Sequence, residues 1–269
     1  MQRFAFIWAH ENKQAVVLVL LSDLKQALYE AVSRSVPEAK IAVAFSGGVD
    51  SSLLAKICQD LAKQVTLVTV GFSGSHDIGF AKGIASKMGI ECRTLEIDYR
   101  DFQENLRRIM QTINCGNTSH IENCIAYFYI CKLAKQNGLD IVLSANGCDE
   151  LFCGYDGYRR AYSGGEAAIM KLMDEKIANE FTLMAEVATV AGQFGVAVRQ
   201  PFLSNKFIEF AKAIPVGQKI KGPDDMTRKH ILRQAALSIG VPEESATKPK
   251  KALQYGSLIH KYFKKARNT

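Results

Sequence analysis

No Cys-x-x-Cys pair occurs among the seven cysteines of this sequence, so the commonest zinc-ribbon and thioredoxin-like patterns are missing. The longest uninterrupted apolar run, 15–21, is far too short to cross a membrane. Polar residues at 11–13 break the pattern of a secretory signal peptide. We therefore expect a cytoplasmic protein whose cysteines are thiols, with a metal or iron–sulfur cluster held by the central cysteines as the less favoured alternative.

The phosphate-loop pattern Gly-x-x-x-x-Gly-Lys-Ser/Thr is also absent, but a different glycine-rich turn joins the apolar run 41–45 to a helical pattern. That turn reads Ser46-Gly47-Gly48-Val49-Asp50-Ser51. Adjacent glycines let backbone N–H groups converge, and a helix start favours an anion. A carboxylate at Asp50 beside phosphates requires a cation, and Mg²⁺ binds both kinds of oxygen. The turn predicts a nucleotide site; a glycine turn with a capping serine is the alternative.

Strand and helix patterns alternate up to about residue 160, and helical patterns follow. The expected strands are 41–45, 65–71, 91–97 and 140–144. The expected helices are 24–36, 51–62, 78–88, 102–113, 121–136, 167–190, 206–214, 226–239 and 257–266, the first of them starting at Ser22-Asp23. Such alternation indicates an α/β fold with a doubly wound parallel sheet and a helical C-terminal part. We expect a short extension at 1–21, an α/β core at 22–160 and a helical part at 161–269.

A second dense segment follows the last expected strand. It reads Asn146-Gly147-Cys148-Asp149-Glu150-Leu151-Phe152-Cys153-Gly154-Tyr155. Asp149 begins a helix at a strand's carboxyl end, as Asp50 does, and such ends meet at one edge of a parallel sheet. Two carboxylates so placed predict one Mg²⁺ site that bridges phosphates. A capping aspartate beside an exposed glutamate is the alternative.

Both segments carry a resemblance to known proteins. The turn 46–51 resembles the pyrophosphate-binding loop of the ATP pyrophosphatases, and 149–155 resembles the Asp-Glu-Leu-Phe-x-Gly-Tyr stretch of the asparagine synthetase family. Further segments at 198–204, 229–233 and 248–250 resemble that family in the same order, with Ser204 in place of its aspartate. The resemblance is to the synthetase domain alone, as in stand-alone asparagine synthetase domain-containing proteins. It implies an adenine nucleotide α-hydrolase-like fold.

The resemblance also implies roles for single residues. ATP would be held by Ala44, Ser46, Gly47, Gly48, Val49, Asp50, Ser51, Val70, Gly71, Ser144, Ala145 and Gly147. Mg²⁺ would be bound by Asp50 and Asp149. Lys229 and Lys250 would contact the phosphates and stabilise the adenylated intermediate, with surface lysine as the alternative for each. Tyr158 matches an aromatic position near the acceptor pocket and is equally compatible with core packing.

The acceptor end is less defined by the sequence. Related synthetases recognise their amino acid near the loop 117–123, where Ser119, His120 and Glu122 offer candidate acceptor-binding groups. The favoured alternative is a capping box, because Glu122 follows Ser119 at a spacing of three. The general base is left open among Glu166, Asp174 and Glu175.

The resemblance implies an ATP-dependent, AMP-forming ligase that makes an amide from aspartate or a related acid. Only about twenty residues precede the synthetase-like part, so no glutaminase domain is expected, and the amine would be free ammonia or come from a separate glutaminase subunit. The net charge of +7 suits ATP and does not by itself exclude RNA. Neither a membrane nor a nucleic acid is an expected partner, and a homodimer stays open. The alternatives are a tRNA-modifying enzyme of the same superfamily and a non-catalytic nucleotide-binding partner.

Overall fold

A sheet of five parallel strands forms the centre of the computed structural model, which describes residues 2–113, 115–249 and 253–267. The strands lie in the order β3-β2-β1-β4-β5, so the chain winds outward in both directions from β1. Their bounds are β1 Lys40–Ala44, β2 Gln64–Phe72, β3 Glu91–Ile97, β4 Ile141–Leu143 and β5 Ala197–Arg199. The predicted α/β doubly wound parallel sheet is confirmed.

Helices cover both faces of the sheet, and alternate strand residues pack into two separate cores. Ile41 and Val43 of β1 point into one core, formed mainly with α1, α2, α3, α9 and α11. Ala42 points into the other core, formed mainly with α4, α5, α14 and the C-terminal half of α8. Because both faces of the sheet are covered, the sequences of these strands are nearly continuously apolar. The helices on the first core are α1 Gln2–Ser35, α2 Val49–Asp60, α3 His76–Met88, α9 Asn205–Ala213 and α11 His230–Ile239.

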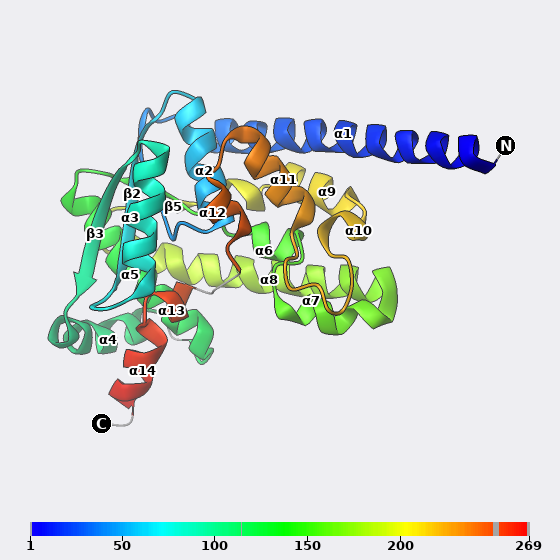
Figure 1. The fold of residues 1–269 in the computed structure, drawn as a ribbon. Coiled ribbons are helices and arrows are strands. Elements are labelled where there is room, and N and C mark those ends of the chain that lie inside the picture. Colours follow the sequence, from blue (N-terminus) through cyan, green and yellow to red (C-terminus); the bar gives the residue numbers. More distant parts are fainter. Residues whose placement is uncertain (1, 114, 250–252, 268–269) are drawn as a thin grey trace.

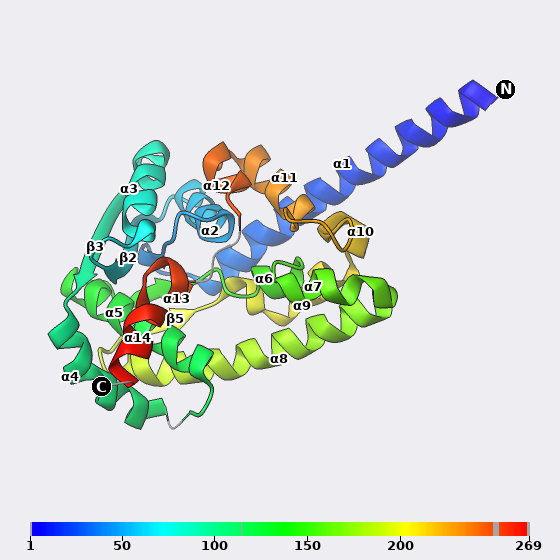
Figure 2. The same cartoon turned by 60° about the horizontal axis from the view of Figure 1, so that its bottom comes forward.

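The remaining helices lie on both faces, with α12 packed against α2 and α11, and α10 against α11 (Figure 2). They are α4 Tyr99–Ile113, α5 Thr118–Gln136, α6 Cys148–Leu151, α7 Asp156–Ala161, α8 Gly165–Gly192, α10 Val216–Lys219, α12 Glu243–Thr247, α13 Leu253–Gly256 and α14 Ile259–Arg267. Two short 3₁₀ turns lie at Tyr162–Gly164 and Pro201–Leu203. Cys124 and Cys131 are buried on α5, as the apolar pattern around them predicts. Within the described residues, no helix combines the length and apolarity needed to cross a lipid bilayer.

Three expectations about the helices and strands are wrong. Helix α1 begins at Gln2 rather than near Ser22 and projects well beyond the body in both views (Figures 1 and 2). No glycine or proline occurs between residues 2 and 35, so nothing stops the helix at Ser22. The expectation of helices alone after residue 160 fails at β5, whose three residues are too few to show a period. Helix α11 begins at His230, not near residue 226.

Candidate active site

The glycine turn after β1 forms one wall of the site. Gly47 has φ of +72°, and a Cβ atom there would lie 2.8 Å from Cδ1 of Phe80, so both conformation and space favour glycine. Ser51 Oγ donates a hydrogen bond to the Gly48 carbonyl at 3.2 Å and closes the turn. Helix α2 starts immediately afterwards without a side-chain cap, which leaves N–H groups at its first turn for an anion.

A serine that sequence reasoning missed supports this turn from behind. Ser245 on α12 is fully buried, and its Oγ lies 2.7 Å from both the Gly47 carbonyl oxygen and Ser52 Oγ. The two ends of this contact are separated by 198 residues along the chain, so no local pattern could reveal it. The contact fixes the curvature of the turn against the C-terminal part of the protein.

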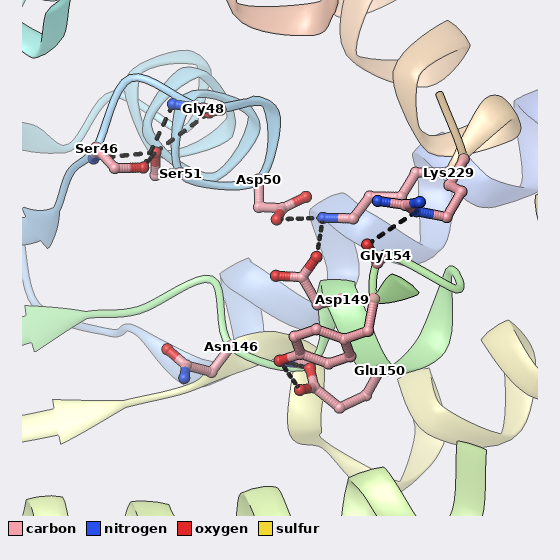
Figure 3. Close-up of polar contacts among 12 residues, drawn as sticks. Ser46, Gly48, Asp50, Ser51, Asn146, Asp149, Glu150, Gly154 and Lys229 are labelled. Atoms are coloured by element: carbon pink, nitrogen blue, oxygen red, sulfur yellow. Dashed lines mark hydrogen bonds and ion pairs between the residues drawn. The ribbon is translucent and has the colours of Figure 1, made fainter. Parts of the chain in front are cut away.

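Two aspartates from different strand ends converge on one lysine (Figure 3). Asp50 lies in the first turn of α2 and Asp149 in α6, and their carboxylates lie 2.5 and 2.6 Å from the Lys229 ammonium group. Lys229 has only 2% of its surface exposed. Burial alone disfavours its charge, but the carboxylates of Asp149 and Asp50 outweigh burial and raise the pKa of Lys229 above its usual value. Lys229 is therefore charged at neutral pH.

The backbone before α11 is strained where it presents this lysine. Arg228 and Lys229 both have left-handed φ values, +50° and +53°, each of which costs on the order of 1–3 kcal/mol for a residue with a side chain. The Asp225 carboxylate holds the turn by accepting N–H bonds from Thr227 and Arg228 at 3.0 Å, and it contacts His230 Nε2 at 2.7 Å. Burial opposes ionisation of Asp225, but hydrogen bonds from the backbone N–H groups of Arg228 and Lys221 and from the His230 side chain lower the pKa of Asp225 to about 2.

Gly154 leaves the space in which the ion pairs form. A Cβ atom at Gly154 would lie 2.0 Å from Asp149 Oδ1 and 2.4 Å from Lys229 Cε, far inside any normal contact. Its carbonyl oxygen accepts a hydrogen bond from Arg228 Nε at 3.1 Å (Figure 3). Only glycine fits between the carboxylate and the lysine stem.

A cavity of about 270 Å³ opens beside these groups at the carboxyl edge of the sheet. Ten of the predicted site residues line it: Ala44, Ser46, Asp50, Ser51, Val70, Ser119, His120, Ser144, Ala145 and Asp149. A smaller space of about 60 Å³ adjoins it and shares Ser46, Asp50 and Ser51. Gly48, Val49 and Lys229 line this smaller space. Groups from the ends of β1, β2 and β4 thus meet in one place.

Other predicted residues lie around the cavity without lining it. Gly47 and Gly147 lie in turns, whereas Gly71 lies near the end of β2, where a Cβ atom would lie 2.5 Å from Ser75 Oγ. Tyr158 is fully buried in the core and donates a hydrogen bond to the Glu150 carbonyl at 2.6 Å, so its contact with an acceptor stays a prediction. Lys250 lies outside the described residues.

The far end of the cavity carries a glutamate that sequence reasoning missed. Glu180 on α8 is buried, lines the cavity and accepts a hydrogen bond from the Asn146 side chain. By contrast, Glu166, Asp174 and Glu175, the expected candidates for a base, are exposed. A sequence signal did exist, since Glu180 falls in the buried stripe of α8 with Met173, Ile177, Met184 and Val187. A glutamate in an apolar stripe marks a buried polar site.

Hydroxyl groups fix the orientation of Asn146. Tyr127 OH donates to Asn146 Oδ1 at 2.7 Å, and Ser144 Oγ also contacts that oxygen. The amide nitrogen of Asn146 is then directed to Glu180. This network joins the end of β4 to α5 and α8 across the cavity wall.

Glu150 lines the same cavity and is held by two hydrogen bonds. Its carboxylate accepts hydrogen bonds from the Gly147 backbone N–H at 3.0 Å and from Tyr155 OH at 2.5 Å. Burial, then the charges of Glu180 and Asp149, raise the pKa of Glu150 to about 8. Glu150 therefore closes the first turn of α6 and is not the exposed glutamate of the alternative.

The loop 117–123 differs from its expected form. Asn117, not Ser119, caps α5, because the Asn117 side chain accepts from the N–H groups of Ser119 and His120. The expected capping box of Ser119 and Glu122 is therefore wrong: the Glu122 carboxylate contacts His260 Nδ1 at 2.7 Å instead. Ser119 and His120 reach the cavity, whereas Glu122 is buried beside α14.

Comparisons with known proteins identify a family model and several relatives that match this sequence. The model of the family described as Asparagine synthase matches residues 23–192 and 170–268. A protein of Methanocaldococcus jannaschii, provisionally named asparagine synthetase 1 (glutamine-hydrolyzing), is 30% identical over 263 residues, which cover 84% of this chain and 48% of that protein. The Escherichia coli K12 protein named asparagine synthetase B (glutamine-hydrolyzing) is 27% identical over 232 residues, covering 79% and 41%. The Gallus gallus protein named asparagine synthetase (glutamine-hydrolyzing) is 25% identical over 248 residues, covering 87% and 43%. The chain thus spans less than half the length of these relatives.

Proposed function

The chain belongs to the asparagine synthase family, and on that premise we propose that it is an ATP-dependent ligase that joins a carboxylate to an amine. In this reaction the carboxylate attacks the α-phosphorus of ATP, pyrophosphate leaves, and the amine displaces AMP. The observation that carries the proposal is the convergence of Asp50 and Asp149 on Lys229 beside a cavity that begins at the glycine turn. The acceptor is aspartate or a related acid.

The glycine turn and Lys229 would hold the triphosphate. The free N–H groups at the start of α2 suit the pyrophosphate part, and the charged Lys229 would face the oxygens on which negative charge grows. Val70, Ser144 and Ala145 line the opposite side of the cavity, in the range of the adenosine part. Lys250 is proposed as a second phosphate contact, on the resemblance alone.

We also propose Mg²⁺ as the cation that accompanies ATP, bound by Asp50 and Asp149. The residues fit such an ion, because Asp50 Oδ1 is buried and has no hydrogen-bond partner in the part of the chain that the structure describes. Carboxylate oxygens are also the ligands that Mg²⁺ prefers. When bound, the ion would neutralise charge on the departing pyrophosphate. Lys229 and Mg²⁺ would then share the two carboxylates.

At the other end of the cavity, Glu180 is the carboxylate we propose as the group that receives a proton from the amine. Its place in the buried stripe of α8 keeps it at the cavity wall, and Asn146 fixes one of its oxygens. Ser119 and His120 remain proposed contacts of the acceptor. The amine is proposed to be ammonia, either free or delivered by a separate glutaminase subunit.

The test measures pyrophosphate and AMP release in the presence of ATP, Mg²⁺ and ammonium, with aspartate first among a panel of carboxylic acids. Mass detection of the amide identifies the acceptor. We expect Asp50→Asn to lower carboxylate-dependent pyrophosphate release by about 100-fold or more, because charge on the leaving group loses its stabilisation.

The matched control is Asp140→Asn, because the Asp140 side chain is 66% exposed and lies at the opposite end of β4. It should release pyrophosphate at the wild-type rate. Release of ADP and phosphate in place of AMP and pyrophosphate would contradict the proposal. Equal pyrophosphate release by wild type and Asp50→Asn would contradict the role of the aspartate.

A further inference from the structure

We propose that Cys115, His120 and Glu186 bind a zinc-class divalent cation behind the acceptor end of the cavity. One ligand atom from each residue, a thiol sulfur, an imidazole nitrogen and a carboxylate oxygen, lies within 4.8 Å of the other two. The three residues come from separate places: the segment before α5, the first turn of α5, and α8. Such a cation would be distinct from the Mg²⁺ proposed above.

The imidazole of His120 separates this cluster from the cavity. The His120 side chain is buried, its Nδ1 lies 2.9 Å from Glu186 Oε2, and its Nε2 lies 3.1 Å from Asn179 Oδ1. His120 and Asn179 line the cavity, whereas Cys115 and Glu186 do not. The Nδ1 side of the ring therefore faces the cluster, and the Nε2 side is held by an amide.

The hydrogen-bond arrangement around His120 is compatible with a metal ion on Nδ1. A neutral imidazole has one N–H group, yet in the orientation of this structure both of its nitrogens face oxygen atoms that accept. A metal ion on Nδ1 would leave the Nε2 N–H to donate to Asn179, so the positions of the two partners suit metal binding. The ring would then match a common pattern of metal-binding histidines, in which the second nitrogen donates to an oxygen that fixes the tautomer.

The position of Cys115 indicates a metal site rather than a simple contact between His120 and Glu186. An ion pair between His120 and Glu186 needs no sulfur, but the backbone N–H of Asn117 holds Cys115 Sγ at 3.3 Å, beside the pair. Tetrahedral zinc with bonds of about 2.0–2.3 Å separates its ligand atoms by about 3.4 Å, so shifts of about 1 Å or less would close the cluster. Binding would release the thiol proton.

The donor set selects the class of metal. A thiolate, an imidazole and one carboxylate suit zinc, whereas magnesium and calcium take oxygen ligands almost exclusively. Three protein ligands leave a fourth position for water. The ion would tie the start of α5 to α8 directly behind Ser119 and His120, and so would fix the acceptor wall of the cavity.

Cobalt(II) titration of the full chain, after treatment with a chelator and under reducing conditions, tests the site through its thiolate-to-cobalt charge-transfer absorption. We expect one equivalent of Co²⁺ to produce that band and Zn²⁺ to displace it. Cys115→Ser should lose the band, and Asn179→Ala should weaken metal affinity about 10- to 100-fold by freeing the ring. The control Cys92→Ser removes a half-buried cysteine of β3 and should keep the band.

A wild-type protein without the band, or a Cys115→Ser protein that retains it, would overturn the site. If Cys115→Ser does not fold, alkylation of the wild-type protein decides the question. Zn²⁺ should slow the reaction of Cys115 with N-ethylmaleimide at least tenfold, as mapped by mass spectrometry. Alkylation at an unchanged rate would equally overturn the site.

Discussion

Replacing Lys229 with methionine removes the positive charge that two buried carboxylates share. The ammonium group lies 2.5 Å from Asp50 and 2.6 Å from Asp149, and only 2% of the lysine surface is exposed. Removing one partner of a buried ion pair costs about 3–5 kcal/mol, because the remaining charge stays buried without compensation. Methionine keeps most of the side-chain volume, so we expect a loss in the free energy of unfolding near the lower end of that range.

Urea unfolding of both proteins at 25 °C measures this difference, and Lys171→Met on the exposed face of α8 is the matched control. The control should change stability by less than about 0.5 kcal/mol. The raised pKa of Lys229 also determines how this loss in the free energy of unfolding depends on pH. The contribution of Lys229 to the free energy of unfolding is complete below the pKa that the lysine has in the unfolded chain. The stability difference between wild type and Lys229→Met should therefore stay constant from about pH 7 to 9. A difference below about 1 kcal/mol would refute the buried-pair interpretation.

Two further substitutions test the space and the turn around this lysine. Gly154→Ala should lower both stability and ATP-dependent activity, because its Cβ would lie 2.0 Å from Asp149 Oδ1. The control is Gly157→Ala, whose Cβ would lie 3.7 Å from its nearest neighbour. Equal thermal unfolding temperatures for the two variants would contradict the argument. Asp225→Ala should destabilise the protein by about 1 kcal/mol at pH 7, after allowance for solvent screening. Because the pKa of Asp225 is lowered to about 2, that loss should shrink as pH falls from about 4 towards 2, as urea unfolding at each pH would reveal. A loss that grows with acid would contradict it.

The central sheet could be predicted from the sequence because its signals are local. Buried parallel strands such as β2 are nearly continuous apolar runs, and Gly89 and Gly138 end the helices that precede β3 and β4. The strand β5 carried no such signal, since three residues cannot show a period. The expected start of α1 is wrong because a misleading signal is present. The pair Ser22-Asp23 has the form of a helix cap, but no glycine or proline before it interrupts the helix.

The convergence of Asp50 and Asp149 was also predictable from the sequence, whereas the contacts of the loop 117–123 were not. Asp50 and Asp149 each follow directly from a strand and a helix start, so the sheet alone brings them to one edge. The cap at Asn117 and the partner of Glu122 depend on how α5 meets α14, which no spacing within 117–123 records. Glu180 could have been noticed from its apolar stripe, but not its contact with Asn146.

The sequence by itself determined the first four strands, the glycine turn and the two carboxylates at the strand ends, because each depends on contacts within a few residues. Tertiary structure alone decided the rest. Lys229 reaches Asp50 across 179 residues, Ser245 supports Gly47 across 198, and His120 meets Glu186 across 66. Such pairs depend on how helices pack on the two faces of the sheet, and packing leaves no regular spacing in the chain.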